Sequence, residues 1–366
     1  FGSGLNRPLE GLYANVVKQI NKANATVISI DTPSGLFGED NTHNNPENIV
    51  KATITLTLQF PKIAFLLPEN ESFVGNWHII GIGLHPLGIE QTSTPYYFVD
   101  SQSIPPQKKH SKFSHKGNYG HALFIGGSYG KMGAAVLASR ACLRSGVGLL
   151  TVHTPECGVN ILQTSVPEAM CFPDKDHSYI SLLNEELTYY SAIGIGCGLG
   201  TEPTTANLLK HVLENATQPL VLDADALNIL ATHPDWLSLI PPQTIITPHP
   251  KEFERLTGSY KNRFHQLTIA LTFSKKYHIF VVLKGAHTAI VCPDGSVYFN
   301  STGNAGMAKG GSGDVLCGII LSLLAQGYTP KESAILGVYT HGAAGDKAAQ
   351  LKGQSAMIAG DIIEQL

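Results

Sequence analysis

The chain of 366 residues is too long for a single small module and suggests about two domains. Charged residues make up 14% of it, hydrophobic residues 43%, and 37 residues are glycine, a composition typical of compact globular domains that excludes a disordered chain. The formal net charge of −3 provides no basic surface for capturing polyanions, so we expect neither a nucleic-acid partner nor a membrane partner.

The apolar runs indicate whether the chain spans a membrane, and the cysteines indicate whether its compartment is reducing. The longest apolar run, Val315–Ala325, falls short of the roughly 20 residues that span a bilayer, so we expect a soluble protein. The six cysteines form no CxxC pair and most have apolar neighbours, as in a reducing compartment, so we expect neither disulfides nor a zinc site. No signal peptide opens the chain, which starts at Phe1 instead of Met. We therefore expect a cytoplasmic protein and a sequence that is a fragment or processed form.

Residues 1–100 predict a partial α/β unit. An amphipathic helix is expected over Pro8–Lys22, followed by β-rich runs at Ala25–Asp31, Ala52–Phe60 and Trp77–Gly83. Because three strands and about one helix make a thin core, we expect further elements of this unit N-terminal to Phe1.

A linker precedes the second half of the chain. The polar stretch Ser101–Ser114 contains Pro105-Pro106 and lacks periodicity, which predicts domains at residues 1–103 and 114–366 joined by a linker at 104–113. Strands and helices then alternate, which favours a mainly parallel sheet covered by helices on both faces, and Asp294-Gly295 predicts a hairpin. The expected elements are strands His121–Gly126, Gly148–His153, Ser191–Gly196, Pro219–Asp223, Thr244–Thr247 and Ile279–Lys284, and helices Gly133–Ser145, Pro203–Asn215, Asp314–Gln326 and Lys331–Gln350.

The loop Gly303–Asp314 (GNAGMAKGGSGD) is the most informative segment. It contains five glycines and runs directly into an apolar helix, so the backbone amides of Gly310–Gly313 would form an anion hole for phosphate. Asp314 has two interpretations, an N-cap of that helix or a general base beside the anion hole, and taken alone the cap is the more common.

Other loops follow strands of the same sheet, where ligands of open parallel sheets collect. Gly126–Ser128 leads into a helix whose small residues suit either close ligand approach or tight packing. Gly194–Gly200 lacks dinucleotide-binding spacing, and no GxxxxGK[ST] occurs, so we reject a Rossmann fingerprint and a P-loop. Asp223 and Asp225 end a strand and either orient a metal-bound water or cap the next helix.

Two further loops offer ligand-binding groups. His249 stands between two prolines that fix its backbone, which suits a ligand-holding residue, although a lone histidine is more often structural. Lys284–Thr288 offers a cation, amides and a hydroxyl suitable for nucleotide phosphates, or forms only a charged turn.

The second half contains, in order, KGNYGHALFIGGSYGKMGAAVLASRACLRSGVGLLTV, VLDADALNIL, TPHPKEFERLTG, VVLKGAHTAIV and GNAGMAKGGSGDVLCGIILSLLAQG. Together these segments, over about residues 114–366, resemble the ADP/ATP-dependent NAD(P)H-hydrate dehydratase family, whose fold is ribokinase-like. FGSGLNRPLEG, SIDTPSGL and TLTLQFPKIAFLLP resemble the C-terminal half of the Rossmann-like NAD(P)H-hydrate epimerase domain of bifunctional repair enzymes.

The resemblance implies roles for individual residues. It assigns Ala134, Gly198, His249 and Asp314 to the hydrated nicotinamide nucleotide, with Asp314 as the catalytic group, and Lys284, Gly285, Ala286, His287, Thr288 and Gly313 to ADP or ATP. In the epimerase part it assigns Gly2, Ser3, Gly4, Leu5, Asn6, Arg7, Pro8 and Asp31 to substrate and Ser34 to K⁺.

This sequence departs from the family's pattern in three places. The usual proline of GPGLG is Cys197 and the usual threonine of GGTGD is Ser312, changes that we expect the site to tolerate. The family's potassium-binding aspartate would precede Phe1.

The resemblance implies metabolite repair of NAD(P)H hydrates. The expected reaction is Mg²⁺- and nucleotide-dependent dehydration of the S hydrate through phosphorylation of the ring hydroxyl, with the N-terminal part belonging to the epimerase that interconverts R and S hydrates. We also expect a homo-oligomer. Two alternatives stay open, a ribokinase-like kinase of a vitamin or sugar alcohol, and a first unit that only binds nucleotide or oligomerises.

Overall fold

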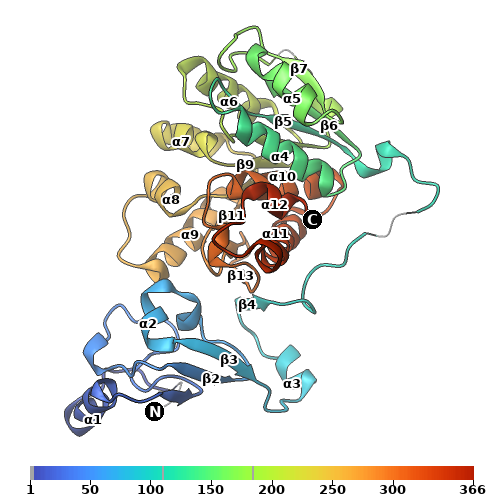
Figure 1. Ribbon diagram of the computed structural model, residues 1–366. Helices are drawn as coiled ribbons and strands as arrows, with labels where there is room; N and C mark the ends of the chain where they lie inside the picture. Colours follow the sequence, from blue (N-terminus) through green and yellow to red (C-terminus); the bar gives the residue numbers. More distant parts are fainter. Residues whose placement is uncertain (1–3, 109–110, 184) are drawn as a thin grey trace. The chain divides into compact units, whose positions relative to one another are not determined.

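The computed structural model describes residues 4–108, 111–183 and 185–366, and the chain divides into two compact units (Figure 1). One unit comprises the residues up to Phe98 together with Tyr260–Ile269, and the other comprises Val99–Ser259 and Ala270–Leu366. The linker predicted at residues 104–113 begins a few residues after this division, and the predicted domain boundaries stay a prediction.

The first unit is built on a three-stranded parallel sheet in the order β1-β2-β3. β1 and β2 lie inside predicted β-rich runs, β3 begins one residue before its predicted run, and the helix predicted from Pro8 begins at Gly11. Its elements are α1 (Gly11–Lys22), β1 (Ile28–Ile30), β2 (Ile54–Leu58), α2 (Glu71–Val74), β3 (Asn76–Ile80) and α3 (Pro86–Glu90), with 3₁₀ turns at Pro46–Asn48, Ile63–Leu66 and Pro68–Asn70. Its core cluster contains Leu36, Ile49, Ala64, Phe65, Phe73 and Val74.

The second unit is built on a sheet with the strand order β4-β13-β12-β11-β10-β9-β8-β5-β6-β7, and β4 contributes only Val99 to this unit. Neighbouring strands from β11 to β7 in this order, seven strands in all, pair in parallel. The pairs β11–β12 and β12–β13 are antiparallel. This arrangement confirms the mainly parallel sheet and the hairpin at Asp294-Gly295. The strands are β4 (Tyr96–Val99), β5 (His121–Ile125), β6 (Leu149–Thr154), β7 (Met170–Pro173), β8 (Ala192–Ile195), β9 (Leu220–Leu222), β10 (Ile245–Ile246), β11 (Phe280–Leu283), β12 (Ala289–Val291) and β13 (Val297–Asn300).

Helices cover both sides of this sheet (Figure 1), with α6, α7 and α8 on one side and α4, α10 and α12 on the other. Strands β8, β9 and β11 are buried along their whole length, as parallel strands with both faces covered are. The helices are α4 (Met132–Arg144), α5 (Val159–Ser165), α6 (Pro203–Asn215), α7 (Asp225–Thr232), α8 (Pro250–Thr257), α9 (Arg263–Tyr277), α10 (Ser312–Ala325), α11 (Pro330–Lys352) and α12 (Ala359–Ile363). Short 3₁₀ turns lie at Lys116–Tyr119, Glu156–Gly158, Leu187–Tyr189, Pro234–Leu239 and Ala305–Met307.

Helix α10 positions the candidate site. Every residue from Val315 to Ala325 is buried, so the longest apolar run of the chain is a core helix that contacts α4, α11 and strands β5, β8 and β9. Its close approach to α4 requires Gly318, because a Cβ there would lie 2.1 Å from the carbonyl oxygen of Ala138. Among the described helices, none has the length and apolar character needed to cross a membrane.

Candidate active site

Four loops follow neighbouring parallel strands of the second unit. Strands β8, β9, β10 and β11 pair side by side in parallel, so the segments after Ile195, Leu222, Ile246 and Leu283 leave the sheet at the same edge. This edge is where open α/β sheets bind ligands, and it brings together loops that the sequence singled out.

Asp223 and Lys284 form a buried ion pair at this edge. Lys284 Nζ donates to Asp223 Oδ1 across 2.7 Å, and the side chains are 21% and 2% exposed, respectively. Burial by itself lowers the pKa of Lys284, but the carboxylate of Asp223 outweighs it and raises that pKa above its usual value. Lys284 is therefore a fixed cation, and Asp223 is neither a helix cap nor a lone carboxylate.

Asp314 lies in the first turn of α10 beside this pair. Helix α10 begins at Ser312 with Gly311 as its N-cap, so the interpretation of Asp314 as the N-cap is wrong. Burial and then the negative charge of Asp223 raise the pKa of Asp314 to about 6, while a hydrogen bond with Cys197 and the Lys284 cation act in the opposite direction. A carboxylate with this pKa is suited to accept a proton near neutral pH.

The glycine-rich loop reaches the same ion pair. A Cβ on Gly313 would lie 3.1 Å from Lys284 Nζ and 3.8 Å from Asp223 Oδ2, which brings the start of α10 next to both charges. Gly311 has a φ of +91°, a conformation that favours glycine, and the first amides of α10 follow it. Lys284 and the positive end of α10 together form a site that attracts phosphate.

Gly198 and Ala134 are neighbours at this site. A Cβ on Gly198, whose φ is +63°, would lie 3.1 Å from Ala134 Cβ, and Ser128 Oγ donates to the carbonyl oxygen of Gly198 across 2.8 Å. The loop after β8 therefore packs against the start of α4, and the two predicted substrate-binding residues come together. Their small size lets the loop and the helix approach each other closely.

His249 caps α8. Its Nδ1 accepts hydrogen bonds from the amides of Lys251 (3.1 Å) and Glu252 (3.3 Å), while the Glu252 carboxylate accepts from the His249 amide (2.8 Å). This is a capping box with histidine in place of serine or threonine. The ring is 44% exposed, so a substrate contact through this ring stays a prediction.

Asp225 joins a network that sequence reasoning did not identify. Its Oδ2 accepts from the amide of Gly200 at 2.9 Å and lies 3.4 Å from Lys131 Nζ, and its Oδ1 accepts from Asn228. Arg255 in turn donates to Asn228 across 2.6 Å. Lys131, Gly200 and Arg255 come from three other segments of the chain, and the only local signal was the DAD spacing around Asp223.

One end of Lys284–Thr288, the loop predicted to bind nucleotide, lies at the candidate active site. Gly285 and Thr288 hydrogen-bond to each other and close a tight turn whose tip, including Ala286, is exposed. His287 Nδ1 lies 3.1 Å from the carbonyl oxygen of Asn300, and burial lowers the pKa of His287. The structure thus brings Lys284 to Asp314 and gives His287 a contact with the last residue of β13.

The predicted epimerase residues lie in the first unit. Asp31, with a φ of +67°, pairs with Lys62 at 2.5 Å, a partner that sequence analysis missed. Leu5 packs against the cluster of Leu9, Val17 and Val50, so its contact is structural. Gly4, Asn6 and Arg7 are exposed and Pro8 is half-buried, whereas Gly2 and Ser3 lie outside the described residues.

The surroundings of Ser34 fit the implied K⁺. Thr32 Oγ1 and Asn48 Oδ1 are buried oxygens without a hydrogen-bond partner, which an ion would explain. A Cβ on Gly35 would lie 2.3 Å from the carbonyl oxygen of Asn48, so Asn48 approaches the Ser34–Gly35 turn closely.

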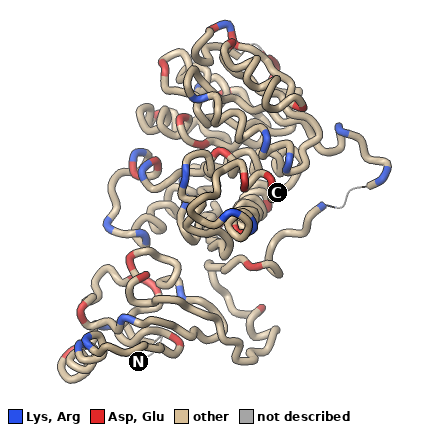
Figure 2. Tube along the Cα trace, viewed as in Figure 1, with Lys and Arg blue, Asp and Glu red and all other residues tan. Residues whose placement is uncertain are grey.

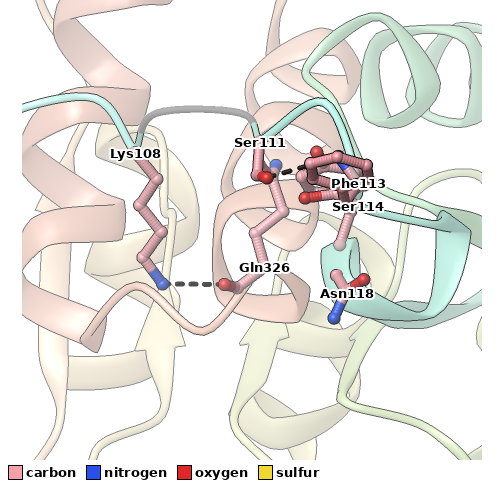
Figure 3. A pocket seen from close by; sticks show the side chains of 7 residues that line it. Lys108, Ser111, Phe113, Ser114, Asn118 and Gln326 are labelled. Carbon is pink, nitrogen blue, oxygen red and sulfur yellow. Dashed lines mark hydrogen bonds between the residues drawn. The ribbon is translucent and has the colours of Figure 1, made fainter.

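A cavity of about 340 Å³ lies elsewhere on the second unit (Figure 3). Its lining includes Gln326 at the C-terminal end of α10, whereas Asp314 lies in the first turn. Lys108 closes it on one side by donating to the carbonyl oxygen of Gln326. The intervening helix of 14 residues separates this cavity from Asp314 by roughly 20 Å.

A doubly covered parallel sheet, an anion-binding glycine loop and a carboxylate at the helix start define a ribokinase-like α/β enzyme. Comparison with solved structures supports this class. A ribokinase-like superfamily protein from Enterococcus faecalis superposes with a TM-score of 0.65 at 30% identity, covering 75% of this chain and 94% of the other. The ADP/ATP-dependent NAD(P)H-hydrate dehydratase from Bacillus subtilis, co-crystallised with ATP and Mg²⁺, superposes with a TM-score of 0.61 at 33% identity, covering 70% and 91%.

Sequence comparison narrows the class to a family. Residues 122–366 match the NAD(P)H-hydrate dehydratase family, and residues 1–64 match the YjeF-related protein N-terminus. The bifunctional NAD(P)H-hydrate repair enzyme Nnr of Moorella thermoacetica is 38% identical over 376 residues, covering 100% of this chain and 71% of the relative. That of Escherichia coli is 34% identical over 367 residues, covering 100% and 69%. The chain belongs to the NAD(P)H-hydrate dehydratase family, and its first 64 residues resemble part of the YjeF-related protein N-terminus.

Proposed function

We propose that this chain catalyses the ADP- or ATP-dependent dehydration of (S)-NAD(P)H hydrate to NAD(P)H. The observation that carries the proposal is the placement of Asp314, with its pKa raised to about 6, beside Lys284 and the glycine-rich start of α10. This combination supplies a base and an anion site at one point, as phosphoryl transfer to a hydroxyl group requires.

The chemistry begins with a poor leaving group. In the hydrate a hydroxyl group stands on the carbon next to the ring nitrogen. Asp314 accepts the hydroxyl proton as the oxygen attacks the terminal phosphorus of the nucleotide, and the bond from phosphorus to the bridging oxygen breaks. Lys284 and the amides of Gly310–Gly313 stabilise the charge that develops on the phosphoryl oxygens.

Elimination completes the reaction. The lone pair of the ring nitrogen expels inorganic phosphate by breaking the carbon–oxygen bond. Loss of a proton from the neighbouring carbon then restores the dihydronicotinamide. The net change is loss of water from the hydrate and hydrolysis of one phosphoanhydride bond.

Mg²⁺ would shield the phosphate charges of the nucleotide when bound. The residues fit such an ion in part, because Asp223 and Asp225 offer carboxylate oxygens at the same sheet edge as Lys284. Asp223 remains the candidate ligand, and Lys284 holds its Oδ1 in place.

The first unit would belong to an epimerase that interconverts the R and S hydrates. Asp31 supports this proposal, since its positive φ and its pairing with Lys62 hold a carboxylate at the end of β1. The buried oxygens of Thr32 and Asn48 support K⁺ near Ser34.

A small-molecule substrate also agrees with the distribution of charged residues. Lys and Arg are interspersed with Asp and Glu in both units (Figure 2). The proposal therefore includes no nucleic-acid or membrane partner, and a cytoplasmic homo-oligomer stays a prediction.

Recovery of NADH absorbance from prepared NADH hydrate tests the function. The protein is mixed with hydrate, Mg²⁺ and either ADP or ATP, and Asp314→Asn serves as the matched variant. We expect nucleotide-dependent recovery that falls by about 10²–10⁴-fold in Asp314→Asn while nucleotide still binds. Accumulation of a stable phosphorylated compound without recovery would instead support a kinase.

A further inference from the structure

Two buried thiols and a carboxylate meet beneath the first turns of α10. Cys197 follows β8, Asp223 follows β9, and Cys317 lies in α10 one turn after Asp314. The two Sγ atoms and a carboxylate oxygen of Asp223 all lie within 4.8 Å of one another. Both cysteines are 0% exposed, Asp223 is 1% exposed, and all six cysteines of the chain are free thiols.

This donor set suits a soft divalent ion. In a tetrahedral site with Zn–S bonds of about 2.3 Å, two sulfur atoms lie about 3.8 Å apart, a separation that the observed limit allows. Asp314 hydrogen-bonds with Cys197 and so places a further carboxylate next to one of the two thiols. We propose that Cys197, Asp223 and Cys317 form a binding site for a thiophilic divalent cation such as Zn²⁺.

Charge at the site favours a cation. The carboxylates of Asp223 and Asp314 outnumber the single ammonium group of Lys284. Both Lys284 Nζ and the amide of Ala224 donate to Oδ1 of Asp223, while Oδ2 is the oxygen nearer to Gly313 and the start of α10. Asp223 can therefore hold the ion and Lys284 through different oxygens.

Binding exchanges protons for the metal. Without an ion, the interaction with Cys317 and burial raise the pKa of Cys197 and keep its thiol protonated. On binding, two S–H bonds break, two metal–sulfur bonds form, and two protons pass to the solvent. No oxidant or reductant is needed.

Binding has a consequence that rests on the proposed function. The ion takes the Cys197 thiol, which is a hydrogen-bond partner of Asp314, so Zn²⁺ would inhibit dehydration at concentrations far below those of Mg²⁺. The binding site itself is independent of turnover, and its test uses no substrate.

Optical titration of the chelator-treated full chain with Co²⁺ tests the site under non-thiol reductant. We expect one equivalent of Co²⁺ to produce a thiolate-to-metal charge-transfer band in the near ultraviolet, which histidine ligands do not produce, and Zn²⁺ to displace it. Cys197→Ala and Cys317→Ala should each weaken binding by at least roughly tenfold and diminish the band. Cys292→Ala, which removes a similarly buried thiol directly after β12, should change neither.

Several outcomes would overturn the site. These are absence of the band in the native chain, a band that persists in both Cys197→Ala and Cys317→Ala, or a band lost in Cys292→Ala. Thermal unfolding of each variant shows whether it folds. If an alanine variant does not, Cys197→Ser and Cys317→Ser retain the side-chain size, and unchanged titrations with these variants would equally contradict the proposal.

Discussion

At the scale of single residues, the site depends on charges that neutralise one another only in the folded chain. Asp223 and Lys284 are 61 residues apart, and the short distance between them arises because β9 and β11 flank β10. Sequence analysis found each residue from its place after a strand. It could not find the pairing, because no local pattern records which loops meet.

Breaking the Asp223–Lys284 pair should destabilise the fold. Lys284→Met removes the ammonium group and leaves the almost fully buried carboxylate of Asp223 without its partner, so we expect a loss of about 3–5 kcal/mol in the free energy of unfolding. Denaturant unfolding measures the loss. The double variant Asp223→Asn with Lys284→Met should recover part of it, and equal instability of the two variants would argue against an unpaired charge as the cause.

His341 should make stability depend on pH. Burial, and then the Lys284 cation, lower the pKa of His341 from 6.5 to about 4, and its Nε2 lies 3.3 Å from Ser312 Oγ. The unfolded chain binds a proton at His341 more readily than the folded chain does. The contribution of neutral His341 to the free energy of unfolding is therefore present above pH 6.5 and is lost as the pH falls toward 4.

The matched variant for this prediction is His341→Gln. Thermal unfolding of both proteins from pH 7 to pH 4.5 should show the melting temperature of the native chain falling more steeply than that of His341→Gln. Parallel curves would show that His341 titrates alike in the folded and unfolded chains.

At the scale of elements, helices with clear end signals were predicted well. α6 runs from Pro203 to Asn215 as expected, since proline in the first turn marks its start. α8 was missed because a helix of eight residues presents little periodicity, and because its cap is His249 instead of a usual capping residue. The start of α10 was placed two residues late, at Asp314, because Ser312 and Gly313 of the loop already belong to its first turn.

Two glycines of α10 should respond differently to alanine. In Gly318→Ala the new methyl group meets the backbone oxygen of Ala138 at 2.1 Å, so α4 and α10 must separate, and we expect a loss of about 1–3 kcal/mol in stability. In Gly313→Ala the methyl group meets the flexible end of Lys284 at 3.1 Å, so the fold should persist while nucleotide binding weakens. Thermal unfolding and nucleotide-binding calorimetry separate the effects. Similar melting temperatures for the two variants would contradict the packing argument.

At the scale of the whole molecule, each unit contains its own set of candidate residues. Asp223, Lys284 and Asp314 all belong to the second unit, whereas Asp31 and Ser34 belong to the first. Sequence patterns predicted the class of the sheet and, through the family resemblance, the ribokinase-like fold. Contacts that join distant segments, such as Cys197 with Cys317 or Asp225 with Gly200, emerged only from the folded chain.

A substitution in the first unit should leave dehydration unchanged. Asp31→Asn removes the charge that pairs with Lys62, and none of the groups assigned to phosphoryl transfer lies in that unit. We expect the rate of nucleotide-dependent NADH recovery from pure S hydrate to match that of the native chain. A large loss of this rate, with the melting temperature unchanged, would show that the first unit takes part in the reaction.

The fate of the hydroxyl oxygen tests the central claim most directly. NADH hydrate prepared in ¹⁸O-labelled water carries the label in its ring hydroxyl group, and the products of a single turnover with ATP in unlabelled water are analysed by mass spectrometry. Phosphorylation by way of Asp314 predicts that the label appears in inorganic phosphate, since the carbon–oxygen bond breaks after the phosphorus–oxygen bond has formed. Label released as water, with unlabelled phosphate, would contradict the account.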